Sequence, residues 1–114
     1  MKRFILTLDL KDDDALIAEY DAWHKKVWPE IKISIKESGV EAMNIYRYGN
    51  RLCMLMEVTD DFSFERKAKM DTENPIVQEW ENLMLKFQQP LNSSGSEKWQ
   101  IMEEIFDLNK KNNE

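Results

Sequence analysis

VEAMNIYRYGNRLCMLMEV, residues 40–58, is the stretch that decides the fold. Apolar and polar residues alternate from Val40 to Tyr48 and again from Arg51 to Val58, and Gly49-Asn50 joins the two segments. Alternation is typical of strands, and a two-residue connection of this composition suits a tight turn, so the stretch predicts a β-hairpin. One face of the first strand belongs either to a solvated side of the sheet or to a pocket, because it carries Asn44, Tyr46 and Tyr48.

The residues before the hairpin predict one strand and two helical segments. Residues 4–10 are short, apolar and partly β-branched, which favours a strand. Pro29 disfavours helical geometry at Trp28, so the first helix should break or bend there, and Pro29 should open a second helix that stops at Gly39. The alternation of isoleucines at 31, 33 and 35 is a competing strand signal, which these helix-end residues outweigh. An aspartate at 12, 13 or 14 can cap the first helix, whose apolar positions are Leu16, Ile17, Tyr20, Trp23, His24, Val27 and Ile31.

The residues after the hairpin predict a second set of helices and a last strand. Residues 62–70 indicate a short helix or helical turn. Asn74-Pro75 supplies a cap and a first-turn proline for a longer helix, which Gln89-Pro90 should end. Leu91 to Glu97 is then expected to be a polar loop, Trp99 to Leu108 a strand, and residues 109–114 a disordered tail. The apolar face of the longer helix consists of Ile76, Val77, Trp80, Leu83, Met84 and Phe87.

The order of predicted elements is β-α-β-β-α-β, the arrangement of an α+β, ferredoxin-like domain with an antiparallel sheet. We expect residues 1–108 to form this single domain, since 114 residues suffice for one core. Helices in such a domain cover one face of the sheet and leave the other bare. An apolar bare face needs a partner, so we expect a homodimer that packs sheet to sheet.

The composition excludes several classes of function. The net charge is −6 and the sixteen cations are scattered, so we expect no nucleic acid partner. No apolar run approaches membrane-spanning length, and Asp9 arrives before a signal-peptide core could form, which favours a cytosolic protein without membrane contact. One cysteine, Cys53, excludes an internal disulfide, one histidine leaves no zinc-ligand set, and three glycines leave no phosphate loop.

The stretch from Tyr20 to Glu30 is the candidate site, because it holds the chain's one histidine among aromatic and acidic residues. Tyr20 and His24 are four residues apart, so on a helix their side chains share a face. An unperturbed histidine titrates at about 6.5 and can pass protons near neutral pH. Each residue also has a plainer interpretation: an inert, hydrogen-bonded His24, a first-turn charge at Glu30, and core packing for the tryptophans, although Trp28 at the proline break is placed to line a cleft.

The combination resembles the L-rhamnose mutarotase family, together with its relatives assigned to L-fucose. The resemblance runs from Phe4 to Leu108 and rests first on Tyr20-x-x-x-His24-x-x-x-Trp28-Pro29-Glu30. Gly39, Ile45-Tyr46, Trp80 and the closing segment from Met102 to Phe106 support it. It implies a dimeric ferredoxin-like α/β barrel that interconverts the α and β anomers of a 6-deoxy-hexose, with no metal and no organic cofactor.

The resemblance also assigns roles to residues. It makes His24 the acid/base catalyst, Tyr20 a substrate-binding residue and Trp28 a pocket tryptophan. Rhamnose-type members carry two adjacent tryptophans in the late helix, whereas we align Glu79-Trp80 with that pair, so the choice of sugar is open. The other candidate substrate-binding residues are Tyr46, Trp80, Glu79 and Glu30.

Two other functions fit the same fold. One is a haem-binding or monooxygenase-type dimeric barrel, in which His24 would be an axial ligand. The other is a non-catalytic sugar-binding module, in which His24 would be purely structural.

Overall fold

The structure is a computed structural model that describes residues 2–90 and 98–109. The predicted loop at 91–97 and the predicted tail from 110 onward lie outside these ranges. None of the helices in the described ranges is long and apolar enough to cross a membrane. The elements are β1 (Lys2–Leu10), α1 (Asp14–Trp23), α2 (Pro29–Glu37), β2 (Val40–Tyr48), β3 (Arg51–Val58), α3 (Phe64–Glu73), α4 (Pro75–Leu85), β4 (Gln88–Gln89) and β5 (Gln100–Ile101).

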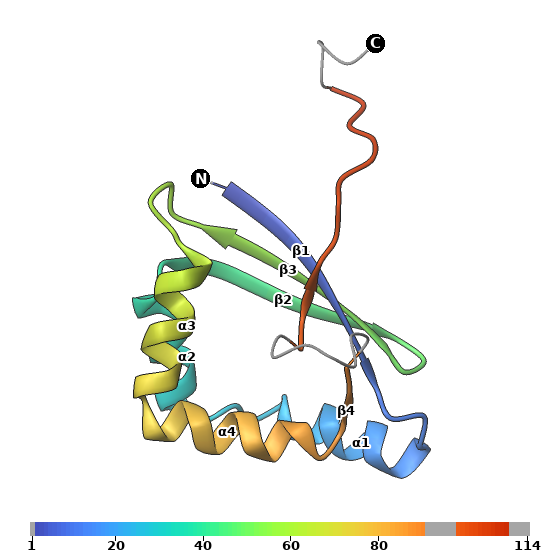
Figure 1. The fold of residues 1–114 in the computed structure, drawn as a ribbon. Helices are drawn as coiled ribbons and strands as arrows, with labels where there is room; N and C mark the ends of the chain where they lie inside the picture. Colours follow the sequence, from blue (N-terminus) through green and yellow to red (C-terminus); the bar gives the residue numbers. More distant parts are fainter. Residues whose placement is uncertain (1, 91–97, 110–114) are drawn as a thin grey trace.

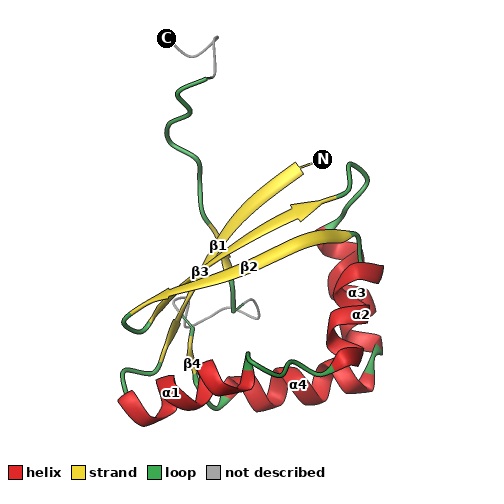
Figure 2. Cartoon of the chain, turned by 180° about the vertical axis from the view of Figure 1, so that it is seen from behind, coloured by secondary structure: helices red, strands yellow, loops and turns green. Residues whose placement is uncertain are grey.

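The strands form one antiparallel sheet in the order β2-β3-β1-β4, and β5 also pairs with β1. The helices lie on one side of this sheet, with α4 running beneath it toward α1 and with both α2 and α3 in contact with α4 (Figures 1 and 2). The predicted ferredoxin-like βαββαβ arrangement is therefore confirmed, with the last strand divided into β4 and β5 along the outer edge of β1.

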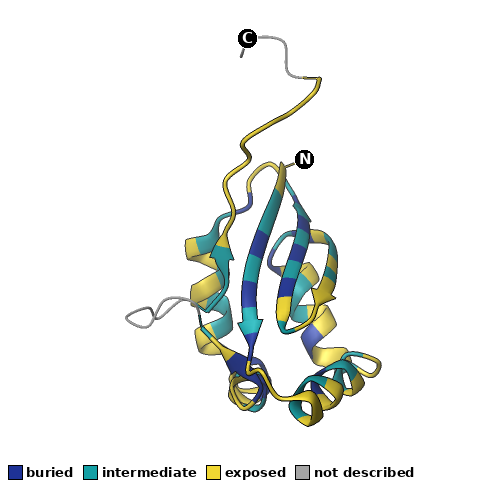
Figure 3. Cartoon of the chain, turned by 90° about the vertical axis from the view of Figure 1, so that its right-hand side faces the viewer, coloured by how far each residue is buried: buried dark blue, intermediate teal, exposed yellow. Residues whose placement is uncertain are grey.

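The predicted hairpin is confirmed at both ends. Tyr48 pairs with Arg51, and Gly49 has a φ of 60°, a left-handed conformation that glycine adopts without strain. Alternation gives the sheet two unlike faces. The side chains that point toward the helices are mostly buried (Figure 3): they include Leu6, Leu8, Leu10, Leu52, Met54, Met56 and Val58.

The first helix ends earlier than the sequence predicts. Asp13 caps α1 by accepting a hydrogen bond from the Leu16 N–H at 3.0 Å, but the helix stops at Trp23 instead of continuing to Trp28. Trp28, with a ψ of 135°, is extended as a residue before proline must be. Pro29 restricts the backbone of Trp28 but not that of residues 24–26. The chain already turns at residues 24–26, and this turn gives α2 a new direction. The prediction that Pro29 opens α2 is confirmed.

Short polar signals set the other helix ends. Gly39, with a φ of 101°, follows α2 as predicted, and its N–H donates to the Lys36 carbonyl. Asn74 accepts hydrogen bonds from the first N–H groups of α4, as its position before Pro75 predicts. The preceding helix, α3, is capped by Ser63 and runs from Phe64 to Glu73, so it begins and ends later than the predicted segment 62–70. The β4 strand follows α4 where the sequence predicted only a helix stop at Gln89-Pro90.

The closing strand is much shorter than predicted. Only Gln100 and Ile101 are strand residues paired with β1, and residues 103–108 run away from the sheet (Figure 1). This segment exposes large apolar side chains, with Ile105 at 92% and Phe106 at 75% of their full exposure. The edge of β1 continues from Ile5 to Lys2, and the Met102 N–H still donates to the Ile5 carbonyl at 2.7 Å, but the following residues leave this edge instead of extending the strand along it.

Candidate functional site

A cavity of about 770 Å³ lies between the helix-facing side of the sheet and helices α1, α2, α3 and α4. Its volume is in the range of small-molecule binding sites. The sheet contributes an apolar floor, which includes Leu6, Ile45, Met54 and Met56, whereas the helices contribute Tyr20, His24 and Trp80. A smaller depression of about 380 Å³ on α1 is lined by Glu19, Ala22, Trp23 and Lys26, and His24 is not part of it.

His24 is held in one orientation at the end of α1. Its Nδ1 lies 2.9 Å from the Tyr20 backbone carbonyl oxygen, and its backbone N–H bonds the carbonyls of Tyr20 and Asp21. A carbonyl oxygen only accepts hydrogen bonds, so Nδ1 must carry a proton. In the neutral ring this leaves Nε2 as the acceptor. The half-buried His24 is therefore arranged to take up a proton at Nε2.

Tyr20 supplies a neutral hydroxyl beside this imidazole. The Tyr20 and His24 rings lie 4.3 Å apart between centroids, and Tyr20 is only 3% exposed. Burial raises the pKa of Tyr20 to about 12; hydrogen bonding with Gln88 lowers it in part, and the negative charges of Glu81 and Asp21 raise it further. Tyr20 thus keeps its proton across the physiological range and can donate it in a hydrogen bond.

Trp80 is the centre of the aromatic cluster and lines the cavity. Its ring meets the rings of Trp28, His24 and Trp23 edge to face, at centroid distances of 5.0, 5.8 and 6.3 Å. Trp28 itself is not among the cavity-lining residues, and its ring packs behind them against that of Trp80.

The structure does not bring three other predicted substrate-binding residues to the cavity. Tyr46 pairs with Cys53 on the face of the sheet away from the helices, because alternation along β2 turns Ile45 inward and Tyr46 outward; it is 60% exposed. Glu79 is exposed on α4 and does not line the cavity. Glu30 is exposed in the first turn of α2, where its plainer interpretation as a helix-end charge applies.

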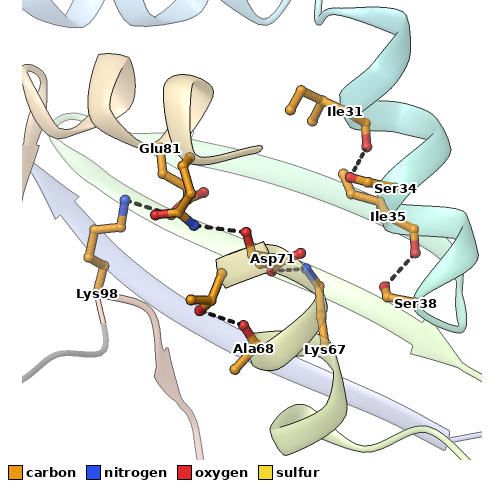
Figure 4. A network of polar contacts seen from close by, with 11 residues as sticks. Ile31, Ser34, Ile35, Ser38, Lys67, Ala68, Asp71, Glu81 and Lys98 are labelled. Carbon is orange, nitrogen blue, oxygen red and sulfur yellow. Dashed lines mark hydrogen bonds and ion pairs between the residues drawn. The ribbon is translucent and has the colours of Figure 1, made fainter. Parts of the chain in front are cut away.

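Apart from Tyr20 and His24, the sequence analysis missed the polar residues that line the cavity: Lys32, Ser34, Lys36, Glu41, Lys67, Asp71, Glu81, Gln88 and Lys98. Glu81 lies one position after Trp80, and Lys98 forms an ion pair with it at 2.8 Å (Figure 4). Gln88 starts the unpredicted strand β4 and is 4% exposed. A usable signal existed for Glu81, because it stands four residues after Val77 and so shares the apolar face of α4. In the described part of the chain, no three histidine, cysteine or acidic side chains come together as a metal site would require.

Comparison with known proteins connects this cavity to an enzyme family. A sequence model of the family described as L-rhamnose mutarotase matches residues 3–108. An L-fucose mutarotase of Xanthomonas campestris is 44% identical over 111 residues, which are 95% of this chain and 89% of that protein.

Two solved structures share the fold. The L-rhamnose mutarotase of Formosa agariphila superposes with a TM-score of 0.71 at 24% identity, covering 95% of this chain and 99% of that one. Tetracenomycin F2 cyclase of Streptomyces glaucescens gives a TM-score of 0.62 at 20% identity, covering 97% of this chain and 100% of that one.

Proposed function

This chain belongs to the L-rhamnose mutarotase family, and on that premise we propose that His24 and Tyr20 open and close the ring of a 6-deoxy-hexose and so interconvert its α and β anomers. The chain is accordingly an isomerase that acts on carbohydrates. The observation that supports the mechanism most directly is the 2.9 Å contact of His24 Nδ1 with the Tyr20 carbonyl, because it leaves Nε2 as the proton acceptor.

Ring opening needs one base and one acid. His24 Nε2 takes the proton of the anomeric hydroxyl, the electron pair of that O–H bond forms the aldehyde carbonyl, and the bond between C1 and the ring oxygen breaks. The ring oxygen takes a proton from the Tyr20 hydroxyl as it leaves. Both groups are positioned within one turn of chain, so the two proton transfers can accompany the bond cleavage.

Ring closure reverses these transfers on the other face of the aldehyde. After rotation about the C1–C2 bond, the sugar hydroxyl attacks C1 and returns its proton to the Tyr20 oxygen. The new anomeric oxygen takes the proton held by His24. Both side chains end in their starting states, and no other reactant is needed. Histidine suits this alternation of acid and base near neutral pH.

The apolar part of the cavity fits the rest of the sugar. The rim of Trp80 and the apolar floor that includes Met54 and Met56 can cover the C–H groups and the 6-methyl group of a 6-deoxy-hexose. We propose L-rhamnose or L-fucose as the substrate. The family model bears the first name and the 44% identical relative the second.

We also propose that the protein is a homodimer that packs sheet to sheet. Two observations support it: the face of the sheet opposite the helices is bare, and the segment after β5 exposes Ile105, Phe106 and Leu108. A second copy would cover both. We further propose that residues 1–108 form one catalytic domain and that the protein works in the cytosol, since an acidic chain with one cysteine suits a reducing compartment.

Saturation-transfer NMR tests the activity. Irradiating the α-anomeric proton of L-rhamnose or L-fucose should reduce the β-anomeric signal when catalytic amounts of protein are present. A folded protein that leaves both sugars at their spontaneous exchange rate would refute the proposal. Sugar binding without exchange would instead favour the non-catalytic module, and a new absorbance band on adding haem would favour the haem-binding alternative.

A further inference from the structure

Helix α4 carries an acid on each side of Trp80, and the structure treats the two differently. Glu79 is exposed and points away from the cavity wall, whereas Glu81 lines the cavity. Successive helix residues differ in direction by about 100°, so positions 77, 80, 81 and 84 share a face that excludes 79. All four of these residues line the cavity. Glu81 is therefore the carboxylate that α4 presents to a bound ligand.

Lys98 fixes the position of this carboxylate. Its Nζ lies 2.8 Å from Glu81 Oε1, and its side chain is 17% exposed. Figure 4 shows Lys98 reaching across from the segment before β5 to α4, so the ion pair joins two parts of the cavity wall that are distant in sequence. A fixed carboxylate beside an ammonium group offers an acceptor and several donors in one place. A sugar hydroxyl can use both at once.

Gln88 adds a second acceptor to the same cavity. Its Oε1 is buried and has no hydrogen-bond partner among the described residues, although the side chain is only 4% exposed. Buried polar atoms are normally paired, so an unpaired one in a cavity wall indicates a group that a ligand or a small rearrangement satisfies. Gln88 also hydrogen-bonds with the Tyr20 side chain, which places it beside the group that we assign to the ring oxygen.

We propose that the Glu81–Lys98 pair, assisted by Gln88, binds a ring hydroxyl away from the anomeric carbon and thereby decides which 6-deoxy-hexose the enzyme accepts. This inference rests on the proposed mutarotase function. With His24 and Tyr20 engaged at the anomeric hydroxyl and the ring oxygen, the hydroxyls of the remaining ring carbons need other partners, and the Glu81–Lys98 pair is placed in the cavity wall to bind one of them. A second ion pair in that wall, Lys67–Asp71 at 2.7 Å, can serve another hydroxyl. L-Rhamnose and L-fucose differ in configuration at C2 and C4, so a fixed acceptor reaches a hydroxyl of one sugar and misses it in the other.

The test compares the ratio of kcat/KM for L-fucose and L-rhamnose in the intact protein and in Glu81→Leu, Glu81→Gln and Lys98→Met. We expect Glu81→Leu to change this ratio by about tenfold or more, since sites that bind a substrate hydroxyl discriminate strongly. Glu81→Gln keeps an acceptor and should retain part of the preference. Lys98→Met should shift the ratio in the same direction as Glu81→Leu.

Glu19→Leu is the matched control. Glu19 is 45% exposed, as Glu81 is, and pairs with Lys86 at 3.7 Å, but it lies outside the cavity. It should leave the ratio unchanged. Monodeoxy sugars sharpen the comparison: the unmodified protein should reject either the 2-deoxy or the 4-deoxy sugar, and Glu81→Leu should lose that rejection.

The inference is overturned if Glu81→Leu slows both sugars equally, because the pair would then only support the fold. If Glu81→Leu fails to fold, Glu81→Gln, which preserves the size of the side chain, takes its place. An unchanged ratio of kcat/KM for the two sugars in Glu81→Gln would then overturn the inference. Dissociation constants for both sugars separate the two proposals. Binding without anomer exchange refutes the mutarotase function, while the ratio of the two constants in Glu81→Leu still decides the role of Glu81.

Discussion

Replacing His24 should separate catalysis from stability, because the structure gives its two ring nitrogens different tasks. His24→Asn places an amide N–H near the position of Nδ1, where it can still donate to the Tyr20 carbonyl, but it has no counterpart of Nε2. His24→Ala removes both groups. If Nε2 is the base, both variants should lose about 10²–10⁴-fold in kcat, which corresponds to about 3–5 kcal/mol of barrier.

The cost in stability should be smaller. His24 is half-buried, and its side chain contributes one hydrogen bond, worth about 0.5–1.5 kcal/mol. The Tyr20 carbonyl also keeps the His24 backbone N–H as a donor, at 3.3 Å, so His24→Ala leaves no orphaned acceptor. We expect His24→Asn to be the more stable variant and equally inactive.

Saturation-transfer NMR gives the rates and urea denaturation gives the free energies of unfolding. Activity of His24→Asn within a few-fold of the unmodified protein would refute the assignment of Nε2 as the base. A loss of several kcal/mol in the unfolding free energy of His24→Ala would show that the lost rate reflects damage to the fold.

Four further outcomes follow from single residues. Because the pKa of Tyr20 rises from 10.0 to about 12 on folding, its contribution to stability is complete below pH 10 and is lost as pH rises to 12; urea titrations over this range should show a fall, on the order of 3 kcal/mol, that Tyr20→Phe lacks. Tyr20→Phe should also slow anomer exchange, and an unaltered rate would place the ring-oxygen acid elsewhere. Gly39→Ala should cost roughly 1 kcal/mol or more of unfolding free energy, since the φ is 101° and an added Cβ would lie 3.1 Å from Thr59 Oγ1; an unchanged melting temperature would contradict the strain. Phe106→Ser should weaken the dimer in light scattering, and a dimer of unchanged concentration dependence would exclude residues 102–108 from the interface.

Local sequence determined the elements whose ends are set by neighbouring residues. The hairpin from Val40 to Val58, the stop at Gly39 and the start of α4 after Asn74 all agree with the structure. Each depends on a turn or cap within a few residues, which is chemistry the sequence displays directly. The family resemblance and the pairing of Tyr20 with His24 across one helical turn could be recognised for the same reason.

Other features depend on partners that lie far away in the chain. The β4 strand exists because Gln88 and Gln89 reach Leu10 and Asp9, whereas the predicted closing strand stops at Ile101 because the chain leaves the edge of β1 soon after it, although β1 itself continues to Lys2. The sequence around Gln88 and Gln89 resembles a loop, and the sequence from Trp99 to Leu108 resembles a full strand, so neither reveals how many residues pair with β1. Pairing across the sheet is a tertiary event, so its extent could not be predicted from local alternation.

The site divides in the same way. Periodicity establishes that Ile45 and Tyr46 point to opposite faces of β2, and that Glu79 and Glu81 lie about 200° apart around α4. It does not say which face is covered. The helices pack on the side of Ile45, and α4 turns Trp80 and Glu81 toward the sheet, so the cavity receives Glu81 and excludes Tyr46 and Glu79. Sequence fixes the relative directions of side chains along an element, and only packing against the rest of the molecule decides which direction is the inside.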